Sequence, residues 1–434
     1  MAINYKKTRG FHIAPKGKTY MVNSRSKWKV DNNKMPGEHE KYVGPYFDPW
    51  VGIKPEQSLG KLEEYLGNLE SFPLKPSQKI YCLKTYMIPS LLYSLLQSDW
   101  KKHILVEIDR RIRNYLKEVL HLALGAADGL LYSASRDGGL GIQKLESLIP
   151  CLTYNKLARF NNSTEMIIHT SATFNNIQIT AEMAKLISSG VDLKTHWQKQ
   201  ELARWKELRC QGIGVSYFED DSISNSWCTD LLKFKSKHLI AALQLRSNTC
   251  PTREFSARGR PTVPKMCRGC RNSTKMLGHI SGQCMSVKGA GIRRHNKMAE
   301  QLTRKAKKLG WTAIPEPHLL DTQGRLRKPD LIFKKGDQAL VVDVTVRMED
   351  NQSSLEKAFQ EKVEYYSRLK PQIKNLTGCR NIGFYGFVIG VRDKFPKDNS
   401  RLLVDLGMPR HKTFSTSTSC LILQLTMDIL QVFT

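Results

Sequence analysis

Residues 325–350 read RLRKPDLIFKKGDQALVVDVTVRMED, and this stretch decides the fold of the second half of the chain. Two runs rich in Leu, Ile, Val and Phe flank KKGDQ, which has the Gly and Asp of a turn. The pattern predicts two strands of one hairpin. Asp330 opens the first run, and Asp343 lies inside the second, LVVDVTV. Because burying an unpaired charge is costly, we expect a cation beside these carboxylates.

The two carboxylates are predicted to lie close together. Asp330 and Asp343 fall on adjacent strands, where cross-strand neighbours are about 5 Å apart. Two carboxylates at that range repel each other unless one is protonated or a divalent cation bridges them. Mg²⁺ is the hard ion that proteins commonly hold with one or two carboxylates and a substrate phosphate. We therefore predict a Mg²⁺ (or Mn²⁺) site at Asp330 and Asp343. The alternative for Asp343 is a structural ion pair, with Arg347 as the candidate partner.

A lysine is the third expected member of this site. Pro-Asp on one strand and an acidic residue on the next resemble the skeleton of the PD-(D/E)xK nucleases. That pattern has a lysine two residues after the second acid, where this chain has Thr345. The helix predicted in SLEKAFQEKVEYYSRL places Lys362 within its apolar stripe and Lys357 on the opposite face. Lys362 is therefore predicted to face the hairpin; the alternative is a lysine that snorkels from the end of the stripe.

A second candidate site lies upstream, in the segment CRGCRNSTKMLGHISGQC at residues 267–284. Its candidate ligands, at CxxC…HxxxxC spacing, are Cys267, Cys270, His279 and Cys284. Thiolates and imidazole at this spacing suit a tetrahedral Zn²⁺, and a segment without a core would take its folding energy from the metal. The alternatives are unrelated cysteines in a reduced protein or a redox CxxC, which would need a thioredoxin-like βαβ context. His295 is expected behind the ligands rather than among them.

The composition indicates a folded protein that meets a polyanion. The chain has 434 residues, enough for two to four domains, and 40% of them are hydrophobic. Lys and Arg total 68 against 40 Asp and Glu, a net charge of +28, for which nucleic acid is the commonest partner. An anionic membrane surface is the rival, but no long apolar run or signal peptide is present, and we expect no membrane partner. The ten cysteines are mostly scattered, which favours reduced thiols and an intracellular protein.

The sequence predicts a multidomain protein that is mostly α in its first part and α/β in its second. Helical spacing dominates from about residue 55, and the stretch CPTREFSARGRPTVPK reads as a linker before the Cys/His segment. The last fifteen residues, CLILQLTMDILQVFT, are expected to form a docked helix or strand. The predicted segments are 1–54, 55–150 (helical), 151–265 (helical linker), 266–290 (zinc knuckle), 291–410 (α/β) and 411–434 (C-terminal extension).

These motifs together resemble those of a known family. KPDLIF…VVDVTV, a following helix with K…YY and an upstream CCHC knuckle are similar to the C-terminal part of a Pol polyprotein (reverse transcriptase/endonuclease). The family is that of type-1 non-LTR retrotransposable elements that insert into ribosomal RNA genes and carry a restriction-like endonuclease. KYVG resembles the segment after the polymerase palm, which makes 1–54 the end of a palm. LKPSQKIYCLKTYMIPSLLYSLL with SRDGGLGI resembles the thumb, in 55–150, and its continuation.

The resemblance implies a fold, an activity and partners. It implies a PD-(D/E)xK restriction-like nuclease domain in 291–410, with Asp330, Asp343 and Lys362 as catalytic residues. This nuclease would nick target duplex DNA, in ribosomal RNA genes, and leave a 3′-hydroxyl that primes reverse transcription of element RNA. Such a protein acts in the nucleus. The alternative, of a different class, is a non-catalytic nucleic-acid-binding module of thumb and zinc knuckle; Thr345 at the usual lysine position keeps it open.

One short string tests whether the chain also carries the polymerase centre. FEDD, residues 218–221, matches the aromatic-x-Asp-Asp string of the family's polymerase. It is followed by SISNSW instead of a hydrophobic strand, and it lies after the thumb-like region. We therefore predict a polar turn at FEDD, and we expect that this chain does not polymerise.

Overall fold

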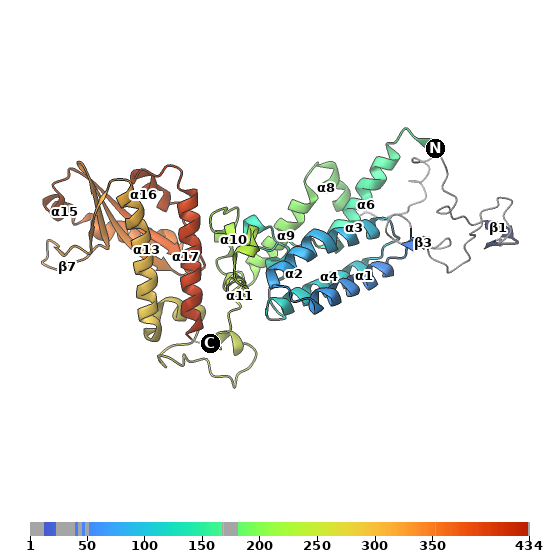
Figure 1. Cartoon of the computed structure of the whole chain (residues 1–434), viewed down its shortest axis with the longest axis horizontal. Coiled ribbons are helices and arrows are strands. Elements are labelled where there is room, and N and C mark those ends of the chain that lie inside the picture. Colours follow the sequence, from blue (N-terminus) through green and yellow to red (C-terminus); the bar gives the residue numbers. More distant parts are fainter. Residues whose placement is uncertain are drawn as a thin grey trace. The chain divides into compact units, whose positions relative to one another are not determined.

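The computed structural model describes residues 13–22, 40–41, 46–47, 52–166, 168, 181–351 and 353–432. The chain divides into two compact units, residues 1–119 with 143–197 (unit 1) and residues 120–142 with 198–434 (unit 2) (Figure 1). Most of segment 1–54, including most of KYVG, lies outside the described residues. Its described parts are two antiparallel pairs, β1 (Ile13–Lys16) with β2 (Thr19–Val22) and β3 (Glu40–Lys41) with β4 (Tyr46–Phe47).

Unit 1 is a set of packed helices, which confirms the helices predicted from the spacing of its apolar residues. They are α1 (Glu56–Ser71), α2 (Pro76–Cys82), α3 (Ile88–Leu96), α4 (Lys102–Val119), α6 (Leu145–Asn161), α8 (Ala181–Ser188) and the start of α9 (Leu193–Glu207). The buried carboxylate of Asp109 on α4 accepts hydrogen bonds from the backbone N–H groups of Leu145 (3.0 Å) and Glu146 (2.8 Å). A carboxylate at a helix N-terminus satisfies donors that have no partner within the helix, so Asp109 fixes α6 against α4.

Unit 2 is built on a four-stranded sheet. In the order of the sheet its strands are β10 (Asn381–Gly390), β9 (Gln338–Arg347), β8 (Leu331–Lys335) and β5 (Thr312–Pro315). β8 and β9 form an antiparallel hairpin around Gly336 and Asp337, as the sequence predicts. β9 and β10 are parallel, and the chain between them forms α14 (Ser354–Ser367) and α15 (Lys370–Thr377). Parallel neighbours need such a crossover connection.

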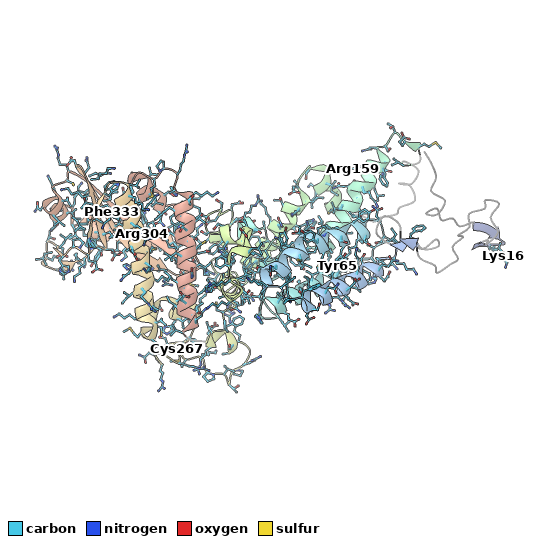
Figure 2. The ribbon with its side chains drawn as sticks, viewed as in Figure 1. Lys16, Tyr65, Arg159, Cys267, Arg304 and Phe333 are labelled. Atoms are coloured by element: carbon cyan, nitrogen blue, oxygen red, sulfur yellow. The ribbon has the colours of Figure 1, made fainter. Side chains whose placement is uncertain are left out.

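Helices cover both faces of this sheet. On one face α13 (Lys288–Lys308), α16 (Asn399–Asp405) and α17 (Lys412–Gln431) enclose a core around Phe333, which is fully buried (Figure 2). α14 and α15 cover the other face with Tyr366 and Ile373. Burial on both faces explains why β9 is almost continuously apolar. α17 lies beside α13 (Figure 1), which confirms a docked C-terminal helix. Within the described residues, no helix combines the length and apolarity needed to cross a bilayer.

The helices before the knuckle pack onto the sheet region through a buried polar network. Arg246, at the end of α11 (Ser236–Arg246), forms an ion pair of 2.8 Å with Asp393, which follows β10. Trp227 donates its indole N–H to the other oxygen of Asp393 (2.7 Å). The guanidinium of Arg246 stacks 3.5 Å from the ring centre of Phe218. Residues 198–250 therefore belong to the same compact unit as the sheet.

FEDD forms a turn in this network, as predicted. Asp220 has a positive φ of 49°, a conformation found mainly in turns. Asp221 is largely covered and accepts a 2.7 Å hydrogen bond from the Lys394 ammonium. Burial acts to raise the pKa of Asp221, but Lys394 and Ser224 outweigh it and lower this pKa. The carboxylate is therefore engaged in packing the turn against the end of the sheet.

The buried pair between Arg246 and Asp393 should be decisive for the stability of unit 2. Arg246→Ala leaves Asp393 buried without its cation, which commonly costs about 3–5 kcal/mol. Arg258→Ala removes the exposed ion pair with Glu254 and should cost less than about 1 kcal/mol. Urea unfolding of the two variants measures the difference. Equal midpoints would show that the network does not hold the helices on the sheet.

Candidate functional site

The register of the hairpin brings Asp330 and Asp343 together. Leu331 pairs with Val342 at the end of the ladder, so the next position, Asp330, falls opposite Asp343. The Asp330 carboxylate accepts a hydrogen bond of 2.7 Å from the backbone N–H of Val344. This contact fixes the carboxylate against the part of β9 that extends beyond β8. Asp330 is partly exposed, whereas Asp343 is only 4% exposed.

Lys362 on α14 supplies the cation that the buried carboxylate requires. Its Nζ lies 2.7 Å from Oδ2 of Asp343, and its side chain remains one-third exposed. Lys357 is exposed on the other face of the helix, in agreement with the predicted stripe. The alternative partner of Asp343 is not used, because Arg347 pairs with Glu361 instead (3.1 Å).

The two carboxylates influence each other electrostatically. Burial raises the pKa of Asp343, and the negative charge of Asp330 raises it further, while Lys362 lowers it. Burial and the charge of Asp343 also raise the pKa of Tyr366, whose hydroxyl donates to the carbonyl of Lys328 (3.1 Å). Tyr366 is therefore a neutral donor at the edge of the site. The repulsion between Asp330 and Asp343 favours a cation between the two carboxylates.

His295 belongs to this site, and the expectation that it stands behind the zinc ligands is wrong. It lies on α13, and its Nε2 is 3.1 Å from Oδ2 of Asp330. The hydrogen bond to Asp330 raises the pKa of His295 to about 9, although burial acts to lower it. The imidazole is therefore protonated at neutral pH. Helical periodicity predicts that His295 lies on a helix, but it does not predict which face of α13 packs toward Asp330. The contact could therefore not be predicted from the sequence.

A glycine on β10 allows Lys362 to reach the sheet. Gly386 is the parallel partner of Asp343. A Cβ at this position would lie 3.0 Å from the backbone of Phe359 and 3.3 Å from Cβ of Lys362. Any side chain at Gly386 would therefore push α14 outward and lengthen the contact between Lys362 and Asp343. Sequence reasoning did not find Gly386, because its close approach exists only once α14 has docked.

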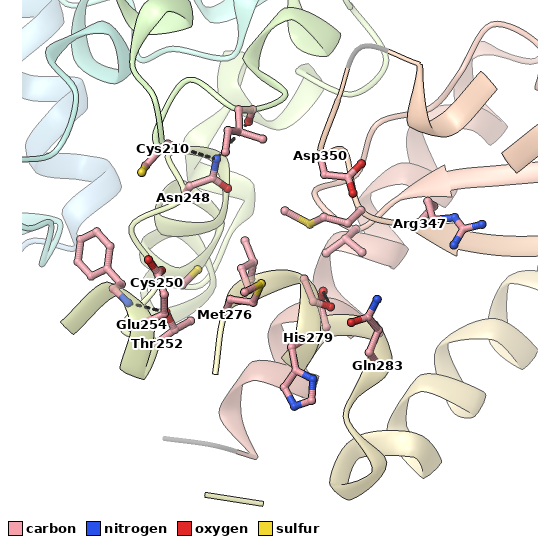
Figure 3. Close-up of a pocket in the computed structure, with 18 of the residues that line it drawn as sticks. Cys210, Asn248, Cys250, Thr252, Glu254, Met276, His279, Gln283, Arg347 and Asp350 are labelled. Carbon is pink, nitrogen blue, oxygen red and sulfur yellow. Dashed lines mark hydrogen bonds between the residues drawn. The ribbon is translucent and has the colours of Figure 1, made fainter. Parts of the chain in front are cut away.

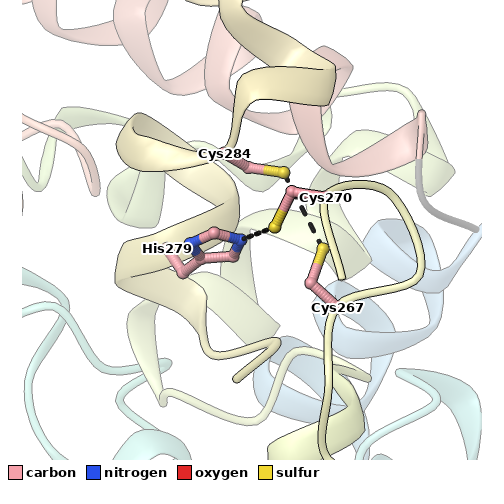
Figure 4. A group of neighbouring side chains, drawn as sticks. All are labelled: Cys267, Cys270, His279 and Cys284. Atoms are coloured by element: carbon pink, nitrogen blue, oxygen red, sulfur yellow. Dashed lines mark hydrogen bonds between the residues drawn. The ribbon is translucent and has the colours of Figure 1, made fainter. Parts of the chain in front are cut away.

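The four residues of the knuckle converge on one point (Figure 4). The ligand atoms of Cys267, Cys270, His279 and Cys284 all lie within 4.8 Å of one another. Two of the sulfur atoms are 3.7 Å apart, and the Cys270 sulfur is 3.3 Å from Nε2 of His279. Zinc–sulfur bonds of about 2.3 Å in a tetrahedron place two sulfurs about 3.8 Å apart. None of the four atoms needs to move far, so the group fits Zn²⁺.

The protonation of Cys267 suits a metal, whereas burial and the neighbouring Cys267 raise the pKa of Cys284. Burial raises the pKa of Cys267, but the N–H groups of Cys270 and Gly269, together with His279 and Cys284, lower it to about 6. All three cysteines of the cluster are free thiols. A thiolate is the form that binds metal, so the backbone prepares Cys267 for Zn²⁺. The bound metal would be structural, because four protein ligands leave no open position.

Comparison with known proteins finds similar chains in one family. No family model matches the chain. A retrovirus-related Pol polyprotein from the type-1 retrotransposable element R2 of Popillia japonica is 29% identical over 393 residues, 88% of this chain and 62% of that protein. A second Pol polyprotein from that species is 27% identical over 432 residues, 97% of this chain and 59% of that protein. The R2 protein of Bradysia coprophila is 26% identical over 438 residues, 97% of this chain and 49% of that protein.

Over most of its length the chain is similar to R2 Pol polyproteins. This confirms the family inferred from the knuckle, the hairpin and the lysine-bearing helix. The chain spans about three fifths of the two Popillia japonica relatives, 62% and 59% of their lengths. In the chain itself, the matched regions include both the helical unit and the unit with the sheet and knuckle.

The knuckle should bind one zinc ion per chain. Cys270→Ser removes a thiolate and should abolish the bound zinc, whereas Cys82→Ser, a cysteine of unit 1, should leave it unchanged. Elemental analysis of freshly purified, chelator-free protein measures both. Zinc-free wild-type protein, or equal zinc in the two variants, would show that the four residues are not a metal site.

Stability should depend on pH through His295. Its pKa is about 9 in the folded chain and about 6.5 when unfolded. The stabilisation is complete below the unfolded value and is lost as the pH rises through the folded value. Because the side chain is 32% exposed, we expect a loss of about 1–2 kcal/mol between pH 7 and 10. Denaturant unfolding without Mg²⁺ checks this, and His295→Asn should remove the decline. Parallel curves for wild type and variant would contradict the assigned ion pair.

Proposed function

We propose that this chain carries a metal-dependent DNA endonuclease that nicks one strand of target DNA for a retrotransposable element. The observation that carries the proposal is the 2.7 Å contact between Lys362 and the buried Asp343, with Asp330 directly across the hairpin. Two opposed carboxylates and an ammonium at the open end of a buried hairpin match the needs of phosphodiester hydrolysis. Mg²⁺ (or Mn²⁺) would be held by Asp330 and Asp343, and it would supply Lewis-acid activation of water and phosphate.

The residues around the carboxylates have separate tasks in the proposed reaction. Lys362 stabilises the negative charge that develops on the scissile phosphate. His295 positions Asp330 through its hydrogen bond. Water adds to phosphorus, the bond from phosphorus to the 3′ oxygen breaks, and that oxygen takes up a proton. The products are a 3′-hydroxyl and a 5′-phosphate, and the free hydroxyl can prime reverse transcription.

The architecture supports the assignment of the nuclease fold. A sheet covered by helices on both faces, with Pro-Asp before one strand and Asp343 inside the next, resembles the PD-(D/E)xK skeleton. Thr345 stands where that skeleton has its lysine, and Lys362 from the following helix takes its place at the carboxylate. The absence of a side chain at Gly386 leaves the space that Lys362 needs to approach Asp343. On this basis we assign residues 291–410 to a restriction-like nuclease domain.

The family relationship supports the proposed partners and location. R2 relatives are Pol polyproteins of transposable elements, and we propose ribosomal RNA genes as the target DNA and element RNA as a second ligand. Segments 55–150 and 266–290, as thumb-like region and zinc knuckle, are proposed to bind nucleic acid, with 151–265 connecting them. The charge of +28 supports both ligands. The site of action would be the nucleus.

Lys362 and Lys357 provide a matched test of the nuclease site, because they lie on opposite faces of one helix. Lys362→Ala should reduce single-turnover nicking by about 10²-fold and leave the affinity for DNA nearly unchanged, since it acts on the transition-state charge. Asp343→Ala should abolish nicking and still bind DNA. Lys357→Ala should cleave bound DNA at a near-normal rate. Nicking of supercoiled DNA with Mg²⁺, under single-turnover conditions, measures all three.

The outcome separates the enzyme from a binding module. If Lys362→Ala and Lys357→Ala behave alike, the helix does not present the catalytic lysine. If wild-type protein binds DNA with Mg²⁺ or Mn²⁺ present and never nicks it, the chain is a non-catalytic nucleic-acid-binding module and the proposal fails.

A further inference from the structure

A groove of 590 Å³ leads from the knuckle to the candidate nuclease site. One wall is the knuckle segment Ser281–Cys284, and another is the first turns of α13 with Lys288 and Arg294. The third wall is Val344–Val346 of β9, where the strand extends beyond β8. Its far end is marked by His295, which contacts Asp330. The groove therefore ends beside His295, one residue away from the Asp330 carboxylate.

The charge of this groove has one sign. The described residues that line it include Lys288, Arg294 and His295 but no Asp or Glu. The neighbouring pocket of 500 Å³ is different, because Glu254 and Asp350 line it together with Arg258 and Arg347 (Figure 3). The excess of positive charge favours an anion in the first cavity, whereas the charges that line the second offset each other.

Arg294 is a buried cation that forms no ion pair with a carboxylate among the described residues, although the more distant Glu349 acts to raise its pKa. It is only 3% exposed, and it donates to Thr426 Oγ1 (2.9 Å) and to the carbonyl of Ser281 (2.7 Å). Its Nε is buried and has no hydrogen-bond partner among the described residues. Burial lowers the pKa of Arg294 to about 10, so it remains charged at neutral pH. A buried guanidinium that lines a groove, and whose charge is not neutralised by an ion pair among the described residues, favours an anionic ligand there.

The N-terminus of α13 adds two features that fit a phosphate. The helix begins Lys288-Gly289-Ala290-Gly291, and added Cβ atoms at either glycine would meet no atom within 4 Å. Packing within the chain therefore does not require glycine here, although glycine weakens a helix relative to alanine. Glycine at a helix N-terminus allows a ligand to approach the backbone N–H groups, which favour anions.

The rim of the groove is apolar. Met285 is 68% exposed and Ile292 is 50% exposed, and they flank Lys288 in the sequence. Nucleic acids combine charged phosphates with flat apolar bases and sugars, and side chains of this type contact the latter. A small anion would use only the interior of the groove.

We propose that this groove binds one phosphodiester of the target DNA strand next to the scissile phosphate. The phosphate would lie against Lys288, Arg294 and the backbone of Gly289–Gly291. The adjoining sugar or base would lie against Met285 and Ile292. In naming DNA, the assignment rests on the proposed nuclease function. In this proposal the first turns of α13 set the distance between the bound phosphate and the scissile phosphate.

Lys288 is the first residue to test, because it is exposed and its loss should not affect folding. Lys288→Ala should weaken binding of a short DNA duplex about 3- to 10-fold, and the slope of log affinity against log salt should become about 0.9 less steep. Lys308→Ala makes the same charge change at the other end of α13 and should have a smaller effect on both. Binding is measured with Ca²⁺ in place of Mg²⁺, so that it does not depend on cleavage. Equal effects of the two variants would overturn the proposal.

Gly291→Ala separates a ligand site from a structural turn. The substitution should raise the unfolding free energy, because alanine favours the helix. If a phosphate approaches this backbone, the same variant should bind DNA several-fold more weakly. A stabilised variant with unchanged DNA affinity would contradict the site. An RNA strand of the same sequence, tested in parallel, should show a smaller loss; a larger loss on RNA would assign the groove to RNA and overturn the proposal for DNA.

The groove and the nuclease function can fail separately. If Asp343→Ala abolishes nicking while Lys288→Ala and Gly291→Ala bind DNA as wild type does, the groove assignment is wrong and the endonuclease stands. If the groove variants lose affinity as expected while wild-type protein never nicks, the groove binds DNA and the nuclease proposal fails.

Discussion

The ion pair between Lys362 and Asp343 is the constraint around which the sheet region is built. β9 is covered on both faces, so a carboxylate at its centre must meet a cation or stay protonated. The opposed Asp330 increases this requirement. α14 satisfies it by packing close to β10, and Gly386 makes the close packing possible. The same arrangement leaves Lys362 one-third exposed, so its ammonium is accessible to a ligand.

α13 joins the two candidate sites through adjacent residues. Arg294 binds the knuckle at the carbonyl of Ser281, and His295 binds Asp330. Because a helix transmits position rigidly, the knuckle and the carboxylates are held in a fixed relation within unit 2. The Cys/His cluster therefore contributes to the geometry of the site as well as to the stability of its own loop.

The sequence predicted the local parts of this structure well and the non-local parts poorly. Alternating and continuous apolar runs were enough to predict the β8–β9 hairpin. Helical periodicity was enough to predict that Lys362 faces this hairpin. The CxxC…HxxxxC spacing was enough to predict that four ligand side chains meet at one point. His295 was misassigned, and Gly386 was missed, because both depend on which helix docks on which face. The contact of Arg246 with Asp393 joins positions 147 residues apart, and no local pattern reports it.

The central claim is that Asp330 and Asp343 together hold one divalent cation. Paramagnetic resonance of Mn²⁺, titrated into the zinc-loaded chain, tests it without requiring any DNA or turnover. The account predicts one Mn²⁺ site in the wild-type chain, lost in Asp343→Ala and retained in Glu361→Ala, whose carboxylate lies on the same helix as Lys362 but pairs with Arg347. Mn²⁺ binding that is identical in the wild-type chain and in Asp343→Ala would contradict it.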